Sequence, residues 1–330
     1  MQLSIVILCW NDRKIIRDCL QSIYAGTHST QFEVIVSDNG STDGSPEFIR
    51  LTFPQVQVLE NCANLRFSKG NNVGIRACRG RWILILNPDT IIRDGALDRW
   101  VQFAEQHPEA GGFGCRVLNS DGSYQGCARP FPTVCREWVA ALYLRFLGYI
   151  SDLFLSDKYV GWKGNTERLI DWQAGCSVLL RADLLSQLGG FDEQFYYYYE
   201  DVDLCRRIWN AGYTILYTPD VVITHLGGQS TQNFRVAFEL DKYRNRYRYF
   251  YKYFGRAGAR RCRHSSLAWI WIRYAAHGLI QLIDFSDARR ARLELYRAAA
   301  EWNMRVDPVR LVETGEEPQV SVQPAARVPQ

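Results

Sequence analysis

The sequence predicts an α/β protein with a mostly parallel, doubly wound sheet and a helical C-terminal extension. Short apolar runs alternate with amphipathic segments through residues 1–110, which is the pattern of repeated β-α-β units. From residue 235 onward the pattern becomes helical and basic. Apolar residues make up 47% of the 330 residues, so the chain can bury a large core, which argues against wholesale disorder.

The first half of the chain supplies the expected sheet. Each apolar run is short, and the segments between the runs place apolar residues at helical spacing. In chain order, the expected elements are strand 3–8, helix 12–24, strand 32–37, a helix beginning at Ser45-Pro46, strand 56–59, helix 70–77, strand 82–86 and helix 95–106. Pro46 suits a first helical turn, where its missing N–H is not needed.

The second half is less regular. We expect a strand at 176–180, a helix at 200–211 that ends at Gly212, and short strands at 214–217 and 221–224. Residues 305–330 are rich in Pro, Glu, Gln and Val without a period, which predicts a disordered tail.

Charge and cysteine content narrow the class of protein. The formal net charge of +4 is too small to indicate a partner by itself. The ten cysteines include no Cys-x-x-Cys pair, and most lie in apolar runs, which predicts reduced core thiols rather than a zinc site or a disulfide framework. The N-terminal residues lack the features of a signal peptide, so we expect a cytoplasmic protein.

Two apolar stretches approach the length of a membrane span. Residues 138–155 are interrupted by Arg145 and Asp152, and residues 267–283 by Arg273, His277 and Gln281. Charge is costly to bury in lipid, so both stretches are expected to be helices that pack in a core or at an interface.

The segment that begins with Asp38 combines a strand end with turn-forming residues. Asp38 follows the second expected strand, and Asn39-Gly40-Ser41 leads toward the helix at Ser45. A carboxylate there can accept a hydrogen bond from the imide N–H of uracil or thymine, and the backbone N–H groups that follow suit phosphate or ribose. The alternative is a turn that only caps the helix.

Residues 64–74 combine basic side chains with glycines. Arg66 and Lys69 can face a diphosphate, and Gly70 and Gly74 would let the backbone approach it closely. The alternative is a solvated loop that caps a helix.

Asn87-Pro88-Asp89 directly follows a buried strand. Mg²⁺ and Mn²⁺ prefer carboxylate and phosphate oxygens, and Mg²⁺ often takes only one or two protein ligands. Pro88 ends the strand, so Asp89 would be one rigid ligand at the sheet edge where Asp38 is also expected. The alternative is a plain turn.

Glu200, Asp201 and Asp203 are expected in the first turn of a helix. The helix dipole favours their charged form there, and a carboxylate near a bound hydroxyl can act as a general base. The run of aromatic residues 195–199 before them suits the face of a sugar ring. The alternative is ordinary acidic decoration of a helix start.

His225 follows an expected strand and precedes a polar, glycine-containing run over 227–230. A single histidine in this position is most often structural. The glycine pair and the polar residues favour a metal ligand or a diphosphate contact.

Taken in this order, these five stretches resemble the inverting family 2 glycosyltransferases of the GT-A fold, with closest likeness to bacterial rhamnosyltransferase-like members. The resemblance covers residues 3–254. It implies a catalytic domain at 1–234, with a nucleotide-sugar half at about 1–110 and an acceptor half at about 111–234, followed by a basic and aromatic helical extension at 235–304 and the tail at 305–330.

The resemblance also implies roles for individual residues. Asp38 would contact the base, Asp89 would bind the metal, and Asp201 would be the catalytic base, with Glu200 as the second candidate. His225 would be a metal or diphosphate ligand. The other donor-side positions are Asn11, Asn39, Ser41, Arg66, Lys69, Asn72 and Asn87, and the acceptor-side positions are Trp172, Gln173, Ala174, Gly175 and Tyr199. The chain departs from the family pattern at Arg66, where a small residue is common, and at Asn87, where a second acid is common.

The activity implied is metal-dependent, inverting transfer of a sugar from a nucleotide diphosphate to a saccharide or lipid-linked hydroxyl in cell-surface polysaccharide assembly. The cofactor would be Mg²⁺ or Mn²⁺. Deoxythymidine-diphospho-rhamnose is the first choice of donor and a uridine-diphospho-hexose the second. The enzyme would be cytoplasmic, with a peripheral membrane contact as one alternative. The oligomeric state stays open, and a homodimer is one alternative.

Two other classes compete with this interpretation. Residues 242–263 carry nine Lys or Arg and no acid, interleaved with aromatic residues, which is compatible with nucleic-acid binding but leaves the acidic motifs unexplained. The same segment suits an anionic membrane face or a solvated helix surface. A sugar nucleotidyltransferase would usually show a glycine-rich basic loop after the first strand, whereas residues 9–12 contain no glycine.

Overall fold

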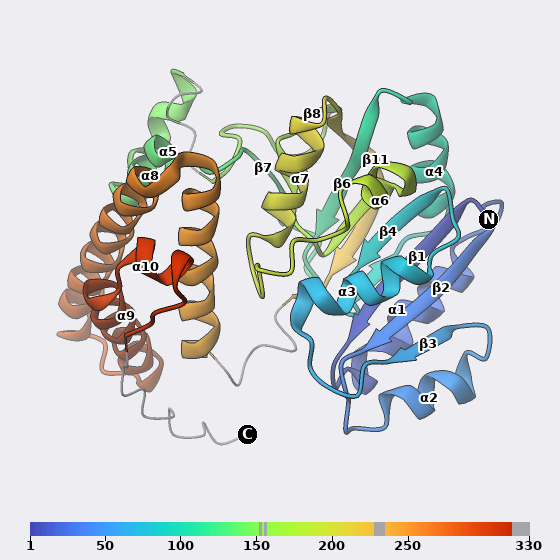
Figure 1. Ribbon diagram of the computed structural model, residues 1–330, viewed down its shortest axis with the longest axis horizontal. Coiled ribbons are helices and arrows are strands. Elements are labelled where there is room, and N and C mark those ends of the chain that lie inside the picture. The colour runs from blue at the N-terminus through green and yellow to red at the C-terminus, as the bar shows by residue number, and fades with distance from the viewer. Residues whose placement is uncertain (152–153, 155–156, 228–234, 319–330) are drawn as a thin grey trace. The chain divides into compact units, whose positions relative to one another are not determined.

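The computed structural model describes residues 1–151, 154, 157–227 and 235–318. These residues fall into two compact units, one formed by Met1–Phe131 with Gly161–Gln232 and the other by Pro132–Val160 with Asn233–Gln330 (Figure 1). The sequence-based division of the chain assigns residues 132–160 to the acceptor half. In the structure this segment groups with the C-terminal helices, because α5 (Val134–Ala141) packs on α8 (Arg235–Gln281).

The first unit has the expected parallel sheet at its N-terminal end. Strands β1 (Leu3–Cys9), β2 (Phe32–Asp38), β3 (Gln57–Glu60) and β4 (Trp82–Leu86) run parallel, in the spatial order β3-β2-β1-β4. Helices α1 (Arg13–Ala25), α2 (Ser45–Thr52) and α3 (Arg66–Ala77) connect them. This alternation puts the carboxyl ends of β1, β2 and β4 at one edge of the sheet.

The sheet continues as a mixed sheet beyond β4. Strand β10 (Ser177–Arg181) runs antiparallel to both β4 and β6 (Ala110–Leu118), and β11 (Thr214–His225) runs parallel to β6. Strand β5 (Thr90–Ile92) pairs antiparallel with the end of β11. The result is a mostly parallel α/β sheet with flanking helices, as predicted.

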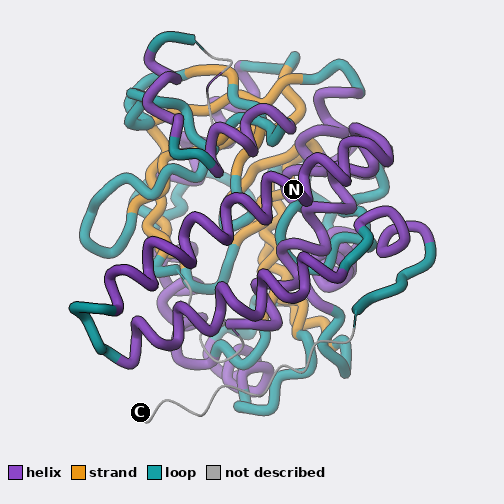
Figure 2. Tube along the Cα trace, turned by 90° about the vertical axis from the view of Figure 1, so that its left-hand side faces the viewer, coloured by secondary structure: helices purple, strands orange, loops and turns teal. Residues whose placement is uncertain are grey.

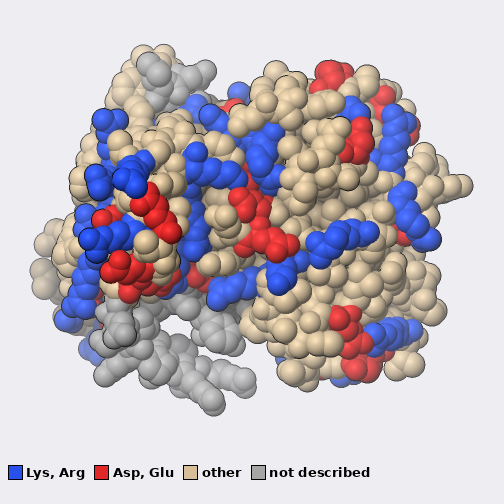
Figure 3. All heavy atoms as spheres, in the orientation of Figure 1, with Lys and Arg blue, Asp and Glu red and all other residues tan. Residues whose placement is uncertain are grey.

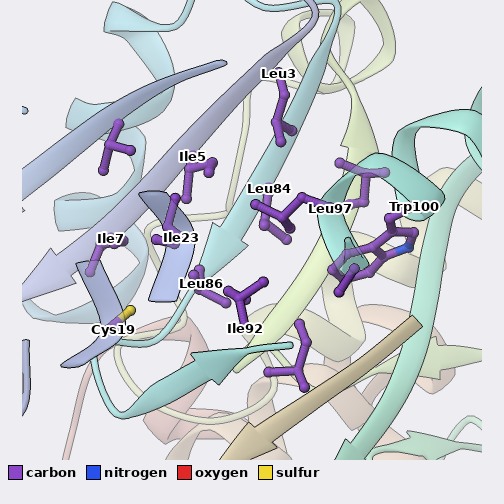
Figure 4. Close-up of a cluster of buried hydrophobic side chains, with 14 of the residues drawn as sticks. Leu3, Ile5, Ile7, Cys19, Ile23, Leu84, Leu86, Ile92, Leu97 and Trp100 are labelled. Atoms are coloured by element: carbon purple, nitrogen blue, oxygen red, sulfur yellow. The ribbon is translucent and has the colours of Figure 1, made fainter. Parts of the chain in front are cut away.

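The core of this unit lies where β1 and β4 meet helices α1 and α4 (Ala96–Gln106) (Figure 4). Every second residue of β1 and β4 contributes to it, which is the period of a strand with one face on a helix layer. The labelled side chains are Leu3, Ile5, Ile7, Cys19, Ile23, Leu84, Leu86, Ile92, Leu97 and Trp100.

Several boundaries differ from the sequence-based expectation. Helix α3 begins at Arg66 instead of Gly70. The two short strands expected at 214–217 and 221–224 are one strand, β11, because both halves pair with β6 across a register shift between Thr218 and Val222.

Pro308–Glu313 forms helix α10 within the segment expected to be disordered. Asp307 caps this helix by accepting a hydrogen bond from the Val309 N–H, and Val309 and Leu311 are buried.

The second unit is helical. It contains α5, the 3₁₀ helix η1 (Leu144–Tyr149), α8, α9 (Asp287–Arg305) and α10. Helix α8 kinks at Gly255, which has φ 66° and ψ −170°. Figure 2 shows two long helices side by side, and α8 and α9 pack against each other. No helix in the described part of the chain is long and apolar enough to cross a membrane.

The basic and aromatic run 242–263 proves to be largely internal to this unit. Its aromatic residues form the core with Trp302 of α9; Tyr243, Tyr247, Tyr249 and Phe250 are all buried. Several of its arginines are paired with acids, most of which are distant in the sequence. Arg244 bonds Asp241 and Glu317, Arg246 bonds Glu137, and Arg256 bonds Glu313. Accordingly, Figure 3 shows acidic residues among the basic ones on this helical unit, on the left.

This packing weakens the observation on which the nucleic-acid alternative depended, although Lys252, Arg256, Arg260 and Arg261 of the run are exposed. A buried aromatic ring cannot stack on a base, and an arginine that is paired within the protein has less charge to offer a phosphate.

Candidate active site

Asp38 lies at the carboxyl end of β2, opposite Cys9 of β1. Its side chain is 2% exposed. One oxygen, Oδ2, accepts hydrogen bonds from the backbone N–H groups of Gly40 (3.0 Å) and Ser41 (2.9 Å). The other, Oδ1, is buried without a hydrogen-bond partner among the described residues. A buried polar atom without a partner is costly, so Oδ1 is suited to accept a hydrogen bond from a ligand.

The loops after β1 and β2 hold each other in place. The Asn11 N–H donates to Ser41 Oγ (2.8 Å), and Asn11 Oδ1 accepts from the Thr42 N–H (2.8 Å). Asn11 adopts the left-handed backbone conformation, with φ 59°. The predicted donor-side residues Asn11 and Ser41 therefore shape the rim beside Asp38.

The predicted donor-side asparagines Asn39 and Asn72 are both buried. Asn39 Nδ2 donates to the Arg66 carbonyl (3.1 Å), and Asn39 Oδ1 accepts from Asn61 (3.0 Å). Asn72 exchanges two bonds of 2.9 Å with the backbone of Phe191. These bonds tie α3 to the neighbouring loops, so both amides serve the framework of the site.

The glycines of α3 do not have the role predicted for them. A Cβ on Gly70 would lie 2.4 Å from Leu8 Cδ1, and one on Gly74 would lie 2.5 Å from Val6 Cγ1. They let α3 lie close against β1 rather than admit a phosphate. Arg66 and Lys69 on the same helix are exposed. The Arg66 guanidinium lies 5.2 Å from the centre of the Tyr196 ring.

Asp89 and His225 meet although 136 positions separate them in the sequence. The pairing of β5 with β11 places His225 opposite Thr90, and the Leu226 N–H donates to the Asp89 carbonyl (2.9 Å). Asp89 Oδ1 then lies 3.2 Å from His225 Nε2. Asn87 lies beside them, and its N–H donates to the Cys176 carbonyl (3.0 Å). Of the polar run after His225, residues 228–230 lie outside the described residues.

Gln125 fixes the orientation of the His225 ring. Its Oε1 lies 2.7 Å from His225 Nδ1, and its Nε2 donates to Asn119 Oδ1 (2.9 Å). Because Gln125 Nε2 donates to Asn119, the oxygen of the Gln125 amide faces His225. His225 Nδ1 therefore carries a proton and donates it to Gln125 Oε1. In the neutral ring, Nε2 is then the nitrogen that presents a lone pair toward Asp89.

This pair of atoms fits a divalent cation. Ligand bonds of about 2.1 Å at right angles place two ligand atoms about 3 Å apart, close to the observed separation. Burial lowers the pKa of His225, but the hydrogen bond that the protonated ring donates to Asp89, the neighbouring Cys176 and the negative charge of Asp89 outweigh burial and raise the pKa overall. The described residues contain no group of three or more His, Cys, Asp or Glu that could hold a metal. A cation at this pair would need further ligands from outside these two side chains, such as phosphate or water oxygens.

Glu200 and Asp201 begin helix α7 (Glu200–Asn210). Tyr198 and Tyr199 before it both have positive φ, 66° and 69°, a conformation that costs energy in residues other than glycine and that sets the direction of the two carboxyl groups. Asp201 Oδ2 accepts from the Gly175 N–H (3.0 Å) and Oδ1 from the Val202 N–H (2.8 Å).

The two carboxyl groups have unequal environments. Burial raises the pKa of Glu200 well above its ordinary value, and the charge of Asp201 raises it further. Burial also raises the pKa of Asp201, but the N–H groups of Gly175 and Val202 and the charge of Arg129 oppose it. Asp201 is therefore the one of the two that ionises first. Asp203 is fully buried and pairs with Arg207 at 2.8 Å, which gives it a structural role.

Of the predicted acceptor segment, only part reaches these carboxyl groups. Gly175 donates its N–H to Asp201, whereas Gln173 is fully buried and donates to the Cys115 carbonyl (3.4 Å). Trp172 donates Nε1 to the Pro130 carbonyl (2.9 Å). Ala174 donates its N–H to the Cys127 carbonyl (3.0 Å).

Sequence reasoning missed two residues of the site, Gln125 and Arg129. Arg129 lies in β7 (Ala128–Arg129), which pairs with β9 (Trp172–Gln173), and its guanidinium is 5.6 Å from the centre of the Trp172 ring. Neither residue belongs to a motif. Only the pairing of distant segments brings them to His225 and Asp201.

Comparison with known proteins identifies the family. The model described as "Glycosyltransferase like family 2" matches residues 2–247. An N-acetylglucosaminyl-diphospho-decaprenol L-rhamnosyltransferase of Mycobacterium tuberculosis is 30% identical over 209 residues, 60% of this chain and 67% of that protein. Rhamnosyltransferase WbbL of Escherichia coli is 25% identical over 176 residues, 51% of this chain and 63% of that protein.

Solved structures show the same fold. A Pyrobaculum calidifontis mannosyltransferase in complex with GDP-Man and Mn²⁺ gives a TM-score of 0.55 at 17% identity, covering 92% of this chain and 87% of that chain. Staphylococcus aureus TarS 1–349 in complex with UDP gives 0.51 at 15% identity, covering 92% of each. The fold is thus GT-A. With the family model spanning most of its length, the chain belongs to the family 2 glycosyltransferases and is rhamnosyltransferase-like.

Proposed function

We propose that this enzyme transfers a sugar, with inversion, from a pyrimidine nucleotide diphosphate to a hydroxyl of a saccharide or lipid-linked acceptor in cell-surface polysaccharide assembly. Deoxythymidine-diphospho-rhamnose is the first choice of donor, because the relatives named above are rhamnosyltransferases, and a uridine-diphospho-hexose is the second. The observation that carries the proposal is the Asp89–His225 pair, which lies at the same sheet edge as Asp38 Oδ1, an oxygen without a hydrogen-bond partner among the described residues.

The spacing of this edge suits a nucleotide diphosphate. Strands β2 and β4 flank β1, so their ends lie about 10 Å apart at the usual strand spacing. Asp38 Oδ1 would accept the imide N–H of the base, which does not distinguish thymine from uracil. Asp89 and His225 would hold Mg²⁺ or Mn²⁺ with the diphosphate. When bound, the ion would neutralise the charge that develops on the leaving group.

The other pair of carboxyl groups, Glu200 and Asp201, acts on the acceptor. Asp201 takes the proton of the acceptor hydroxyl as the hydroxyl oxygen bonds to the anomeric carbon, and the bond from that carbon to the diphosphate breaks on the opposite face. This single displacement inverts the anomeric configuration. Glu200, with its raised pKa, stays protonated beside it.

A donor screen tests this proposal. The full chain is incubated with nucleotide sugars of different bases and sugars, with Mn²⁺ and an acceptor mixture, and free nucleoside diphosphate is measured. Release is expected with deoxythymidine-diphospho-rhamnose. Release with purine nucleotide sugars alone would contradict the role given to Asp38.

The pH dependence of kcat/KM separates the two carboxyl groups. A general base works only when ionised, and the pKa of Asp201 is raised, so the acid limb should lie above the ordinary range of Asp, about 4. Glu200→Gln should retain activity and the same limb, because Glu200 is already neutral there. Loss of activity in Glu200→Gln would assign the base to Glu200.

The loss of activity at low pH cannot result from acid unfolding driven by Glu200 and Asp201. The folded pKa values of Glu200 and Asp201 are raised, so the folded protein binds these protons more tightly than the unfolded chain. Their contribution to stability therefore grows as the pH falls through the folded pKa values.

Gln125→Leu keeps the size of the side chain but cannot accept the proton of His225 Nδ1. We expect divalent-dependent binding of a nucleoside diphosphate to weaken by about 10–100-fold, as for other groups that orient a ligating histidine. Calorimetry with and without Mn²⁺ measures this. Gln106→Leu, at an exposed position in α4, is the matched control. Unchanged binding in Gln125→Leu would remove His225 from the metal site.

A further inference from the structure

Exposed apolar residues gather where α8 and α9 are joined. Helix α8 ends at Gln281 and α9 begins at Asp287, so the two form a hairpin with a short connection (Figure 2). Ile283 is 84% and Phe285 68% exposed. The exposed apolar residues of this hairpin end, called the hairpin tip below, are Leu279, Ile280, Leu282, Ile283 and Phe285. Large exposed apolar patches often mark interaction sites, so this composition makes the hairpin tip a candidate contact surface.

Positive charge surrounds the hairpin tip. Arg290 and Arg292, at the start of α9, are exposed. Burial lowers the pKa of His277, and the charges of Arg289, Arg292 and Arg273 lower it further. Arg289 also bonds Asp284, at 3.1 Å. Residues 273–297 carry five arginines and three acids, Asp284, Asp287 and Glu294, so the charge there is positive by two and complements an anionic surface.

Aromatic residues lie farther along the hairpin from the tip. Trp269 packs against Tyr296 across the two helices, with ring centres 5.8 Å apart, and Trp271 against Tyr274 at 5.7 Å. The Arg273 guanidinium lies 3.8 Å from the Trp269 ring centre and 4.5 Å from that of Tyr143. The contact with Tyr143 connects this part of the hairpin to a second exposed apolar segment, which contains Leu142, Phe146, Tyr149 and Ile150.

The hairpin thus combines an exposed apolar tip with arginine, tryptophan and tyrosine residues, which are the residue types that bind at a membrane interface. We propose that the hairpin tip inserts into the headgroup zone of an anionic lipid membrane, with the arginines on lipid phosphates. The surface is the end of the apolar stretch 267–283 rather than the basic run 242–263, because several basic residues of that run are paired within the protein. It would hold the enzyme where a lipid-linked acceptor lies.

Vesicle flotation of the full chain tests this. The vesicles contain phosphatidylcholine alone or mixed with phosphatidylglycerol, at low and high salt. The wild type should float with the anionic vesicles at low salt and less at high salt. Ile283→Ser with Phe285→Ser should lower the bound fraction at least about tenfold, since each side chain loses an apolar burial. Leu51→Ser, which changes an 85% exposed leucine of α2 in the other unit, should bind like the wild type.

Thermal unfolding and light scattering accompany the flotation. Equal binding of the tip variant and wild type, or no binding of wild type to anionic vesicles, would overturn the proposal. Wild-type dimers that the tip variant loses, without vesicle binding, would instead make the tip a contact between copies. Release of nucleoside diphosphate with a soluble acceptor should be the same in the tip variant, so failure here and failure of the proposed function are distinguishable.

Discussion

Asp201→Asn is expected to lower kcat by about 10²–10⁴-fold, the usual effect of removing a general base, while the affinity for the nucleotide sugar changes little. The substitution keeps the size of the side chain but removes its ability to take the acceptor proton. Steady-state kinetics with saturating acceptor and calorimetry of donor binding measure the two effects separately.

The fold of this variant needs its own control, because both oxygens of Asp201 accept backbone hydrogen bonds from Gly175 and Val202. Thermal unfolding of Asp201→Asn and of Asp18→Asn, at an exposed position on α1, shows whether the fold is kept. A decrease in kcat of less than about tenfold in a folded variant would mean that Asp201 is not the base and would favour Glu200.

Asp89→Ala is expected to abolish the divalent-dependent part of nucleoside diphosphate binding and to lower turnover by about 10²-fold or more, because a metal at a leaving group contributes several kcal/mol. Asp89 follows the end of β4, and its side chain bonds His225. Because Asp89 is buried, thermal unfolding of the variant must show that the fold is kept. Calorimetry with the nucleoside diphosphate, with and without Mn²⁺, measures the loss.

Asp94→Ala is the matched control, since the Asp94 side chain is 85% exposed and bonds only the surface residue His28 among the ion pairs described. Its binding should equal that of the wild type. If Asp89→Ala bound the nucleoside diphosphate with the same Mn²⁺ dependence as the wild type, Asp89 would not be a metal ligand.

Local sequence patterns predicted the elements that carry the site, and long-range pairing explains what they missed. The alternation of apolar runs and amphipathic segments correctly placed Asp38 at the end of a strand and Glu200 at the start of a helix. The bond from Gln125 to His225 joins residues 100 positions apart. No periodicity or motif in the sequence predicts this contact, because the contact depends on which strands become neighbours in the sheet.

The same reason explains why the sequence did not show that several arginines of the basic run are paired. Residues 242–263 contain no acid, so local charge counting predicts an exposed positive surface. The acids that neutralise it, such as Glu137 for Arg246 and Glu313 for Arg256, come from α5 and α10. Likewise, the composition of residues 305–330 predicts disorder, whereas the cap at Asp307 and the burial of Val309 and Leu311 form α10.

Product analysis tests most directly the claim that these two carboxylate sites move a sugar between a nucleotide diphosphate and an acceptor hydroxyl. The full chain, Mn²⁺ and deoxythymidine-diphospho-rhamnose are incubated with a polyprenyl-diphosphate-linked N-acetylglucosamine, and the acceptor is examined by mass spectrometry and by NMR of the new anomeric centre. We predict an acceptor lengthened by one rhamnose of inverted configuration, formed by the wild type and not by Asp201→Asn. A product with retained configuration, or the same yield from Asp201→Asn, would contradict the single displacement through Asp201.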